Sequence, residues 1–147
     1  MQKIITLLSF IFASISICYA TSVSDLDEAK KKAILSDKYI LVEFSGSDWC
    51  PPCIRLNNEV FSKSEWKSWA ADNVISVLID FPNSGQSKEV RKKNEIIAKK
   101  LKVNGFPTIL ILDKHGDEQF RTGYVSGGAE VYINHLLLLA KKNVISF

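Results

Sequence analysis

After its first twenty residues, the chain alternates short apolar runs with segments whose apolar residues recur every three or four positions. The apolar runs are typical of strands buried on both faces, and the wider spacing is typical of helices. They predict strands at residues 39–44, 74–79 and 108–112, and a fourth at 118–124 after a turn at 114–117. The helical spacing predicts helices at residues 25–36, 54–60, 88–102 and 126–142, and one that begins near residue 62.

Local signals mark the start of the helix near residue 62. Ser62 stands where a capping side chain is expected, and Glu65, three residues later, can reach back to its amide. Phe61 and Trp66 occupy the positions of a hydrophobic staple.

The order of these elements predicts the fold class. Alternation of strands with helices argues for a parallel core with both faces covered, and the tight turn at Gly116 adds an antiparallel hairpin. We therefore expect an α/β domain with a central mixed sheet of about four strands flanked by helices. The helix at residues 88–102 forms an extra helical stretch before the third strand.

The first twenty residues have the features of a secretory signal peptide. Lys3 supplies a positive start, and a short apolar run with several serines follows it. Cleavage after Ala20 would leave one domain of residues 21–147 in the periplasm. Cys18 would be removed with the signal peptide. The alternative is that Cys18 is the acylated cysteine of a lipoprotein, although Ile17 does not suit the position before such a cysteine.

Composition restricts the partners that we expect. Apolar residues make up 46% of the sequence, which is ample for a core, and the net charge of +3 comes from interspersed acids and bases. Nucleic-acid-binding domains concentrate basic residues in a patch, so no nucleic-acid partner is expected. The helix at residues 88–102 has an apolar stripe of Val90, Ile97 and Leu101 and many basic residues. Its basic side is interpreted as a solvated face, with docking to an acidic partner as the alternative.

After removal of the signal, Cys50 and Cys53 are the only cysteines. A disulfide between them closes a loop too short to restrain the unfolded chain strongly, which disfavours a structural role. A zinc site needs four ligands, and only His115 and His135, in a turn and a distant helix, could complete one. Attached haem requires a histidine directly after the second cysteine, where Ile54 stands. No metal or other cofactor is therefore expected.

The spacing of the pair fits redox chemistry directly. Cys50 would stand at the start of a helix, where amides and the helix dipole stabilise a thiolate. Pro51 and Pro52 would fill the first turn, which tolerates proline best. Cys53 would lie one turn further, beneath Cys50, and could attack a mixed disulfide formed there. Trp49 would cover one side of the exposed sulfur.

Two motifs together resemble the thioredoxin superfamily. They are WCPPC at residues 49–53, after an apolar strand, and GFPT at residues 105–108, which opens a later strand. The longer string VEFSGSDWCPPC is similar to exported thioredoxin-like oxidoreductases of the DsbH type and, more loosely, to the thioredoxin-like domain of DsbD. The resemblance covers residues 25–143.

The resemblance implies roles for individual residues. Cys50 would be the nucleophile and Cys53 the resolving thiol. Pro107 would be a cis-proline beside the disulfide, and the backbone before it, at Phe106, would pair with the bound substrate.

The family also keeps a buried acid on the strand before the motif, which can accept a proton from the resolving cysteine. Glu43 is the candidate, but it lies seven residues before Cys50, where the family usually has six. A bulge within residues 45–47 would absorb the extra residue. The alternative is that Glu43 is a strand residue at an edge of the sheet. Asp48 is expected to be a solvated loop acid.

The favoured function is an exported thiol:disulfide oxidoreductase that keeps protein thiols in the periplasm reduced. Pro51 and Pro52 have no N–H to offer a Cys50 thiolate, which favours a reductase over an oxidant. The alternatives are a disulfide isomerase or oxidant, and a thioredoxin-fold binding module without catalysis. We expect a monomer that acts on disulfide-containing exported proteins. By resemblance, a membrane electron donor of the DsbD type would recharge it.

Overall fold

The structure, a computed structural model, describes residues 25–147. The expected signal peptide at residues 1–20, with Cys18, lies outside this part. The helices are α1 (Leu26–Ser36), α2 (Pro51–Leu56), α3 (Ser64–Asn73), α4 (Lys88–Lys100) and α5 (Gly128–Lys142), and a π-helical segment η1 (Asn57–Phe61) continues α2. The strands are β1 (Tyr39–Ser45), β2 (Val74–Asp80), β3 (Thr108–Leu112) and β4 (Glu118–Thr122). None of the helices in residues 25–147 is both long and apolar enough to cross a membrane.

The four strands form one mixed sheet in the order β2-β1-β3-β4, which confirms the expected fold class. The expectation of a parallel core is wrong in detail, since only β1 and β2 are parallel, and β3 is antiparallel to both of its neighbours. Thr108 pairs with Phe44, at the end of the sheet where β2 finishes at Asp80. The chain leaves and re-enters the sheet at this same end, so β3 must run in the opposite direction.

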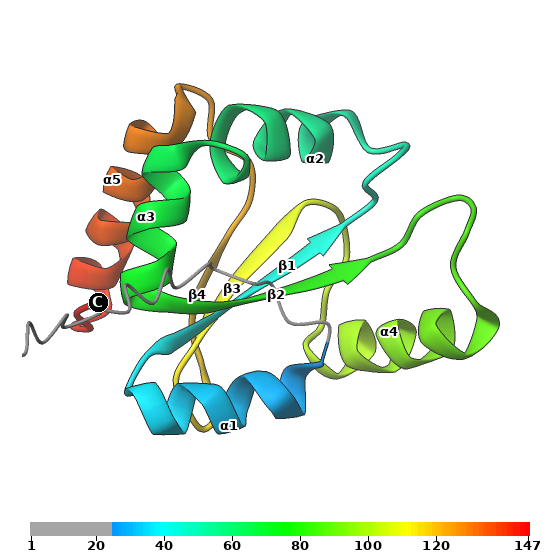
Figure 1. Cartoon of the computed structure of the whole chain (residues 1–147), viewed down its shortest axis with the longest axis horizontal. Coiled ribbons are helices and arrows are strands. Elements are labelled where there is room, and N and C mark those ends of the chain that lie inside the picture. The colour runs from blue at the N-terminus through cyan, green and yellow to red at the C-terminus, as the bar shows by residue number, and fades with distance from the viewer. Residues whose placement is uncertain (1–24) are drawn as a thin grey trace, which may run out of the picture.

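Helices cover both faces of the sheet. Figure 1 shows α2, α3 and α5 on one side and α1 and α4 on the other. The first core joins Leu41 of β1 to residues that include Leu56, Trp66 and Tyr132. The second core joins the alternate β1 residues, such as Val42, to α1 and, more loosely, to α4. Side chains along β1 point in turn to opposite faces, so this central strand supplies both cores.

The region after α2 differs from the sequence expectation. The helix that begins at Pro51 continues through η1 to Phe61. Ser62 therefore directly follows this helix, and α3 begins only two residues after it. The Ser62 hydroxyl instead donates to the carbonyl of Asn58, and α3 begins at Ser64 without a side-chain cap. Ser62 is therefore not a helix cap. Phe61 does contact Trp66, with ring centroids 4.7 Å apart, as the staple requires.

Helix α4 ends two residues earlier than expected, and its predicted apolar stripe is only partly correct. Ile97 and Leu101 pack against the second core, but Val90 is 48% exposed. The buried residue of α4 is Asn94, whose amide donates to the backbone carbonyl of Asp80 at 2.9 Å. A polar side chain thus holds α4 to the end of β2.

Candidate active site

Cys50 and Cys53 are joined by a disulfide at the start of α2. Cys50 is the N-cap residue, with extended backbone, and Pro51 and Pro52 form the first helical positions. Both cysteines are largely covered, with exposed fractions of 4% and 1%. The two cysteines are thus almost equally covered, and the expectation of an exposed Cys50 is wrong for the oxidised protein.

Few amides at this helix start are available to a Cys50 sulfur. Pro51 and Pro52 have no N–H. The N–H groups of Cys53 and Ile54 both donate to the Cys50 carbonyl at 3.0 Å. The first amides of α2 are therefore absent or already engaged, and the helix dipole is the main support left for a thiolate at Cys50.

Trp49 directly precedes Cys50, and its side chain is held in a fixed orientation. Its indole N–H donates to the Phe81 carbonyl at 2.7 Å. The ring lies over Gly46, where an added Cβ would be only 2.4 Å from it. The residue is nevertheless 44% exposed. One face of Trp49 is thus held against the protein while the rest is open to a bound chain.

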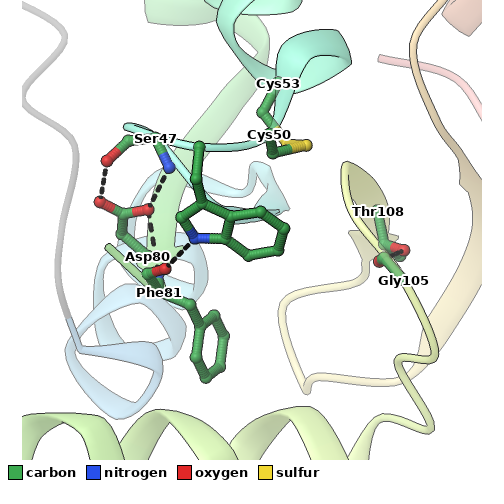
Figure 2. Close-up of a disulfide and its surroundings, with 8 residues drawn as sticks. Ser47, Cys50, Cys53, Asp80, Phe81, Gly105 and Thr108 are labelled. Carbon is green, nitrogen blue, oxygen red and sulfur yellow. Dashed lines mark hydrogen bonds between the residues drawn. A yellow bond between two sulfur atoms is a disulfide. The ribbon is translucent and has the colours of Figure 1, made fainter. Parts of the chain in front are cut away.

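The loop that precedes Cys50 is tied to the end of β2. The backbone N–H and hydroxyl of Ser47 both donate to the Asp80 carboxylate, as Figure 2 shows, and the Phe81 N–H donates to it as well. The Asp48 carboxylate accepts the Asn83 N–H at 3.0 Å. Asp48 is exposed, as expected, but it also fixes this loop. Sequence reasoning did not identify Asp80, because its partners lie 33 residues away.

The loop before β3 completes the surroundings of the disulfide. The peptide bond between Phe106 and Pro107 is cis, as the family resemblance implied. The Phe106 ring meets the Trp49 ring edge to face at 5.8 Å and stacks on Phe81 at 5.1 Å. Figure 2 shows Gly105 and Thr108 of this loop across from the disulfide. The structure therefore brings Phe106 and the WCPPC motif together.

Glu43 lies in the middle of the sheet and not at its edge, because β1 runs between β2 and β3. The pairing of β1 with β2 is regular through Ser45, so no bulge absorbs the extra residue. A tight turn does so instead, in which the Gly46 carbonyl accepts the N–H groups of Trp49 and Cys50.

The pKa of Glu43 is raised to about 7, mainly because burial disfavours the charged form; a hydrogen bond with the Ser45 side chain opposes this rise, and the negative charge of Asp80 adds a smaller one. The carboxyl lines a pocket of about 210 Å³ between β1, β2, α3 and η1, with Asn57 and Lys67 among the other polar residues. A partly buried carboxyl whose pKa lies near neutrality can take up and release a proton at physiological pH.

A second polar cluster lies on the α2 side of the site and had no sequence signal. The Tyr124 hydroxyl donates to the Glu59 carboxylate at 2.7 Å, and this bond raises the pKa of the Tyr124 phenol. The Arg55 guanidinium lies 5.2 Å from the centre of the Tyr124 ring. These contacts hold the loop between β4 and α5 against α2 and η1.

Metal-binding side chains do not gather in the described residues. Across residues 25–147, no group of three or more His, Cys, Asp or Glu side chains is placed to hold an ion. His135 is paired through its ring nitrogen with the Thr122 hydroxyl at 2.8 Å.

Comparison with known proteins agrees with this geometry. Residues 26–135 match the model of the thioredoxin-like domain family. The chain is 34% identical over 108 residues to the disulfide bond reductase DsbH of Chlamydia pneumoniae, covering 73% of this chain and 65% of that protein. It thus spans slightly less than two thirds of that relative's length.

Solved structures agree as well. The structure of a DsbH oxidoreductase superposes with a TM-score of 0.75 at 29% identity, and the match covers 95% of both chains. A thioredoxin from Thermus thermophilus superposes with a TM-score of 0.60 at 19% identity, over 84% of this chain and 90% of that one, which is a likeness of fold alone. This chain therefore belongs to the thioredoxin-like family and carries that family's redox disulfide at the start of α2.

Proposed function

We propose that this chain is a thiol:disulfide oxidoreductase that works as a reductase of disulfides in exported proteins of the periplasm. The observation that carries the proposal is the Cys50–Cys53 disulfide at the start of α2, preceded by Trp49, whose ring meets Phe106 of the loop with the cis peptide bond. The likeness to a protein named disulfide bond reductase supports the direction. A binding module without catalysis would have no need of this arrangement.

The reaction needs only the two cysteines. In the reduced protein, the Cys50 thiolate attacks one sulfur of a substrate disulfide and displaces the other as a thiolate. Cys53, as its thiolate, then attacks the Cys50 sulfur of the mixed disulfide and releases the second substrate thiolate. Two electrons pass from the protein to the substrate, and the protein is left with the Cys50–Cys53 disulfide.

Glu43 is proposed as the group that takes the proton from Cys53 in the second step. It lies on the face of β1 that α2 and η1 cover, and its pKa of about 7 suits proton transfer near neutral pH. The Cys53 thiol is almost completely buried, so bulk water has little access to it. An internal carboxylate is then the natural proton acceptor.

The start of α2 supports the proposed direction of electron flow. Strong oxidants of this fold stabilise the nucleophilic thiolate down to a pKa of about 3.5, against about 7 in thioredoxin. Here the two prolines offer no N–H, and the Cys53 N–H donates to the Cys50 carbonyl. With a weakly stabilised thiolate, the disulfide should be hard to reduce, with a potential nearer about −270 mV than about −120 mV.

The remaining parts of the proposal concern partners. We propose that the protein acts as a monomer on disulfide-containing exported proteins. A membrane electron donor of the DsbD type would reduce its disulfide again after each cycle. The resemblance of the motif region to thioredoxin-like domains of that system supports this assignment.

Equilibration with glutathione tests the direction. We expect a potential more negative than about −180 mV, the value of protein disulfide isomerase. Replacing Pro52 by alanine restores one N–H near Cys50 and should shift the potential upward, whereas Pro52→His adds a cation and should shift it further. A potential above that of the isomerase would make the protein an isomerase or oxidant. Failure to exchange with glutathione at all would favour a binding module.

A further inference from the structure

An open groove of about 490 Å³ lies between α4 and the loop before β3, next to the redox site. We call it the α4 groove, and it is lined by Phe81, Glu95, Ala98, Lys99, Lys102, Val103, Asn104 and Phe106. Its apolar members are buried or partly buried and are taken as its floor, and the two lysines are exposed. The groove has no part in the cysteine chemistry described above.

The α4 groove is continuous with the disulfide through ring contacts. Phe106 belongs to the groove and touches Trp49, the neighbour of Cys50, with ring centroids 5.8 Å apart. Phe81, on the groove floor, stacks on Phe106 at 5.1 Å. An extended chain advances about 3.3 Å per residue, so a peptide joined to Cys50 that passes the Trp49 and Phe106 rings would enter the groove within a few residues.

The charge of the α4 groove is positive in effect. Its one acid, Glu95, pairs with Arg91 at 3.4 Å on the same helix. Within residues 25–147, neither Lys99 nor Lys102 forms a salt bridge. Glu118 lies near enough to Lys102 to act on it electrostatically, but its salt bridge is with Arg121. The two lysines thus border the apolar residues of the groove without a salt bridge of their own.

The end of α4 that carries these lysines is held in place. Lys102 adopts a left-handed backbone conformation with φ of 53°. The Arg121 guanidinium donates to the carbonyls of Leu101 and Lys102, and Glu118 pairs with that same guanidinium. The lysines therefore project from a fixed helix end.

We propose that the α4 groove is a substrate-docking surface for a polypeptide segment that carries an apolar and an acidic side chain three to four residues from the cysteine under attack. The apolar side chain would lie on the floor formed by Phe81, Val103 and Phe106, and the acid would pair with Lys99 or Lys102. The inference rests on the proposed function and names the class of substrate that the site prefers.

The test compares the reduction of matched peptides by the reduced full-length protein. Each peptide contains one cysteine linked by a disulfide to mercaptoethanol, and the rate of release of the peptide thiol is measured. One peptide has leucine and glutamate at the third and fourth positions on both sides of the cysteine; the other has leucine and lysine there. Wild-type protein should prefer the acidic peptide roughly three- to tenfold in second-order rate, as one or two exposed ion pairs would give.

Variants locate the preference. Lys99→Glu with Lys102→Glu should abolish or invert it. Lys88→Glu with Lys92→Glu makes the same change in net charge on the same helix outside the groove, and should leave most of the preference intact. Serine in place of leucine in the acidic peptide should lower its rate about threefold or more, because partial burial of leucine is lost.

The outcomes separate the two proposals. Equal rates for both peptides, or equal effects of the two double variants, would refute the docking surface while the reductase function stands. If neither peptide nor mercaptoethanol disulfide alone is reduced, the proposed function fails and the docking surface fails with it.

Discussion

Glu43 gives the strongest quantitative prediction, which concerns stability as a function of pH. Its pKa is about 7 in the folded protein, because the carboxyl is buried, against 4.5 in the unfolded chain. Between these two pH values the folded state binds more protons at this residue than the unfolded state. The free energy of unfolding must therefore fall as pH rises from 4.5 to about 7, and stay lowered above that. At pH 8, the ionisation of Glu43 lowers the free energy of unfolding by about 3 kcal/mol relative to the protonated carboxyl.

The substitution Glu43→Gln removes the ionisation and keeps the shape of the side chain. We expect the variant to match wild type at pH 4.5 and to be more stable by about 2–3 kcal/mol at pH 8. Other titratable groups near Glu43 are Lys67, Asp80 and Tyr132, and all are retained in both proteins. Their contributions to the pH dependence largely cancel in the difference.

Urea unfolding of the oxidised protein across this pH range measures the effect. Glu130→Gln, which neutralises an exposed acid on α5, serves as the matched control and should give a nearly flat difference. If the difference in free energy of unfolding between Glu43→Gln and wild type does not change with pH, folding does not raise the pKa of Glu43 and the argument is wrong. Destabilisation of the variant at pH 8 would contradict it more strongly.

Three further outcomes are expected. Cys53→Ser should accumulate mixed disulfides with substrate proteins on non-reducing gels and Cys50→Ser should not; the reverse pattern would exchange the two roles. Gly46→Ala places a methyl group 2.4 Å from the Trp49 ring. We expect it to lower the free energy of unfolding in urea by about 1–3 kcal/mol and to raise the exposure of Trp49 to acrylamide quenching. An unchanged protein would show that the loop adjusts to the methyl group without cost. Tyr132→Phe removes a hydrogen bond of 3.0 Å to the Gly123 carbonyl, in the loop between β4 and α5, and should lower the free energy of unfolding by about 1 kcal/mol. An unchanged free energy of unfolding would mean that water takes the place of the phenol hydroxyl.

The sequence predicted the strands well, because an apolar run such as that of β1 is a local property. It could not predict that β3 is antiparallel to β1. That direction depends on where α4 ends and the chain re-enters the sheet, which no local pattern records. The misplaced cap at Ser62 has a similar origin, since the π-helical segment η1 prolongs α2 by several residues.

The redox pair was predictable because its chemistry depends on residues that are adjacent in sequence. The contacts that position it were not. Asp80 binds Ser47 from 33 residues away, and Tyr124 binds Glu59 from 65 residues away. Such pairs are brought together only by the folded sheet, and neither residue type nor spacing marks them beforehand. Glu43 was identified through the family resemblance, but its place in the central strand required the strand order.

Asp80 is bonded both to the loop before Cys50 and to helix α4. Its carboxylate accepts hydrogen bonds from Ser47 of that loop, and its backbone carbonyl accepts the side-chain amides of Gln86, just before α4, and of Asn94, within α4. The loop before Cys50 and the helix that borders the α4 groove are therefore fastened to a single residue at the end of a paired strand. Binding partners that need a loop to order lose conformational entropy on association, and their binding is slowed by that step. Little ordering of this kind is left to be done here. Under the proposed function we therefore expect a substrate to meet a preformed surface, with a rate of binding set by diffusion and charge.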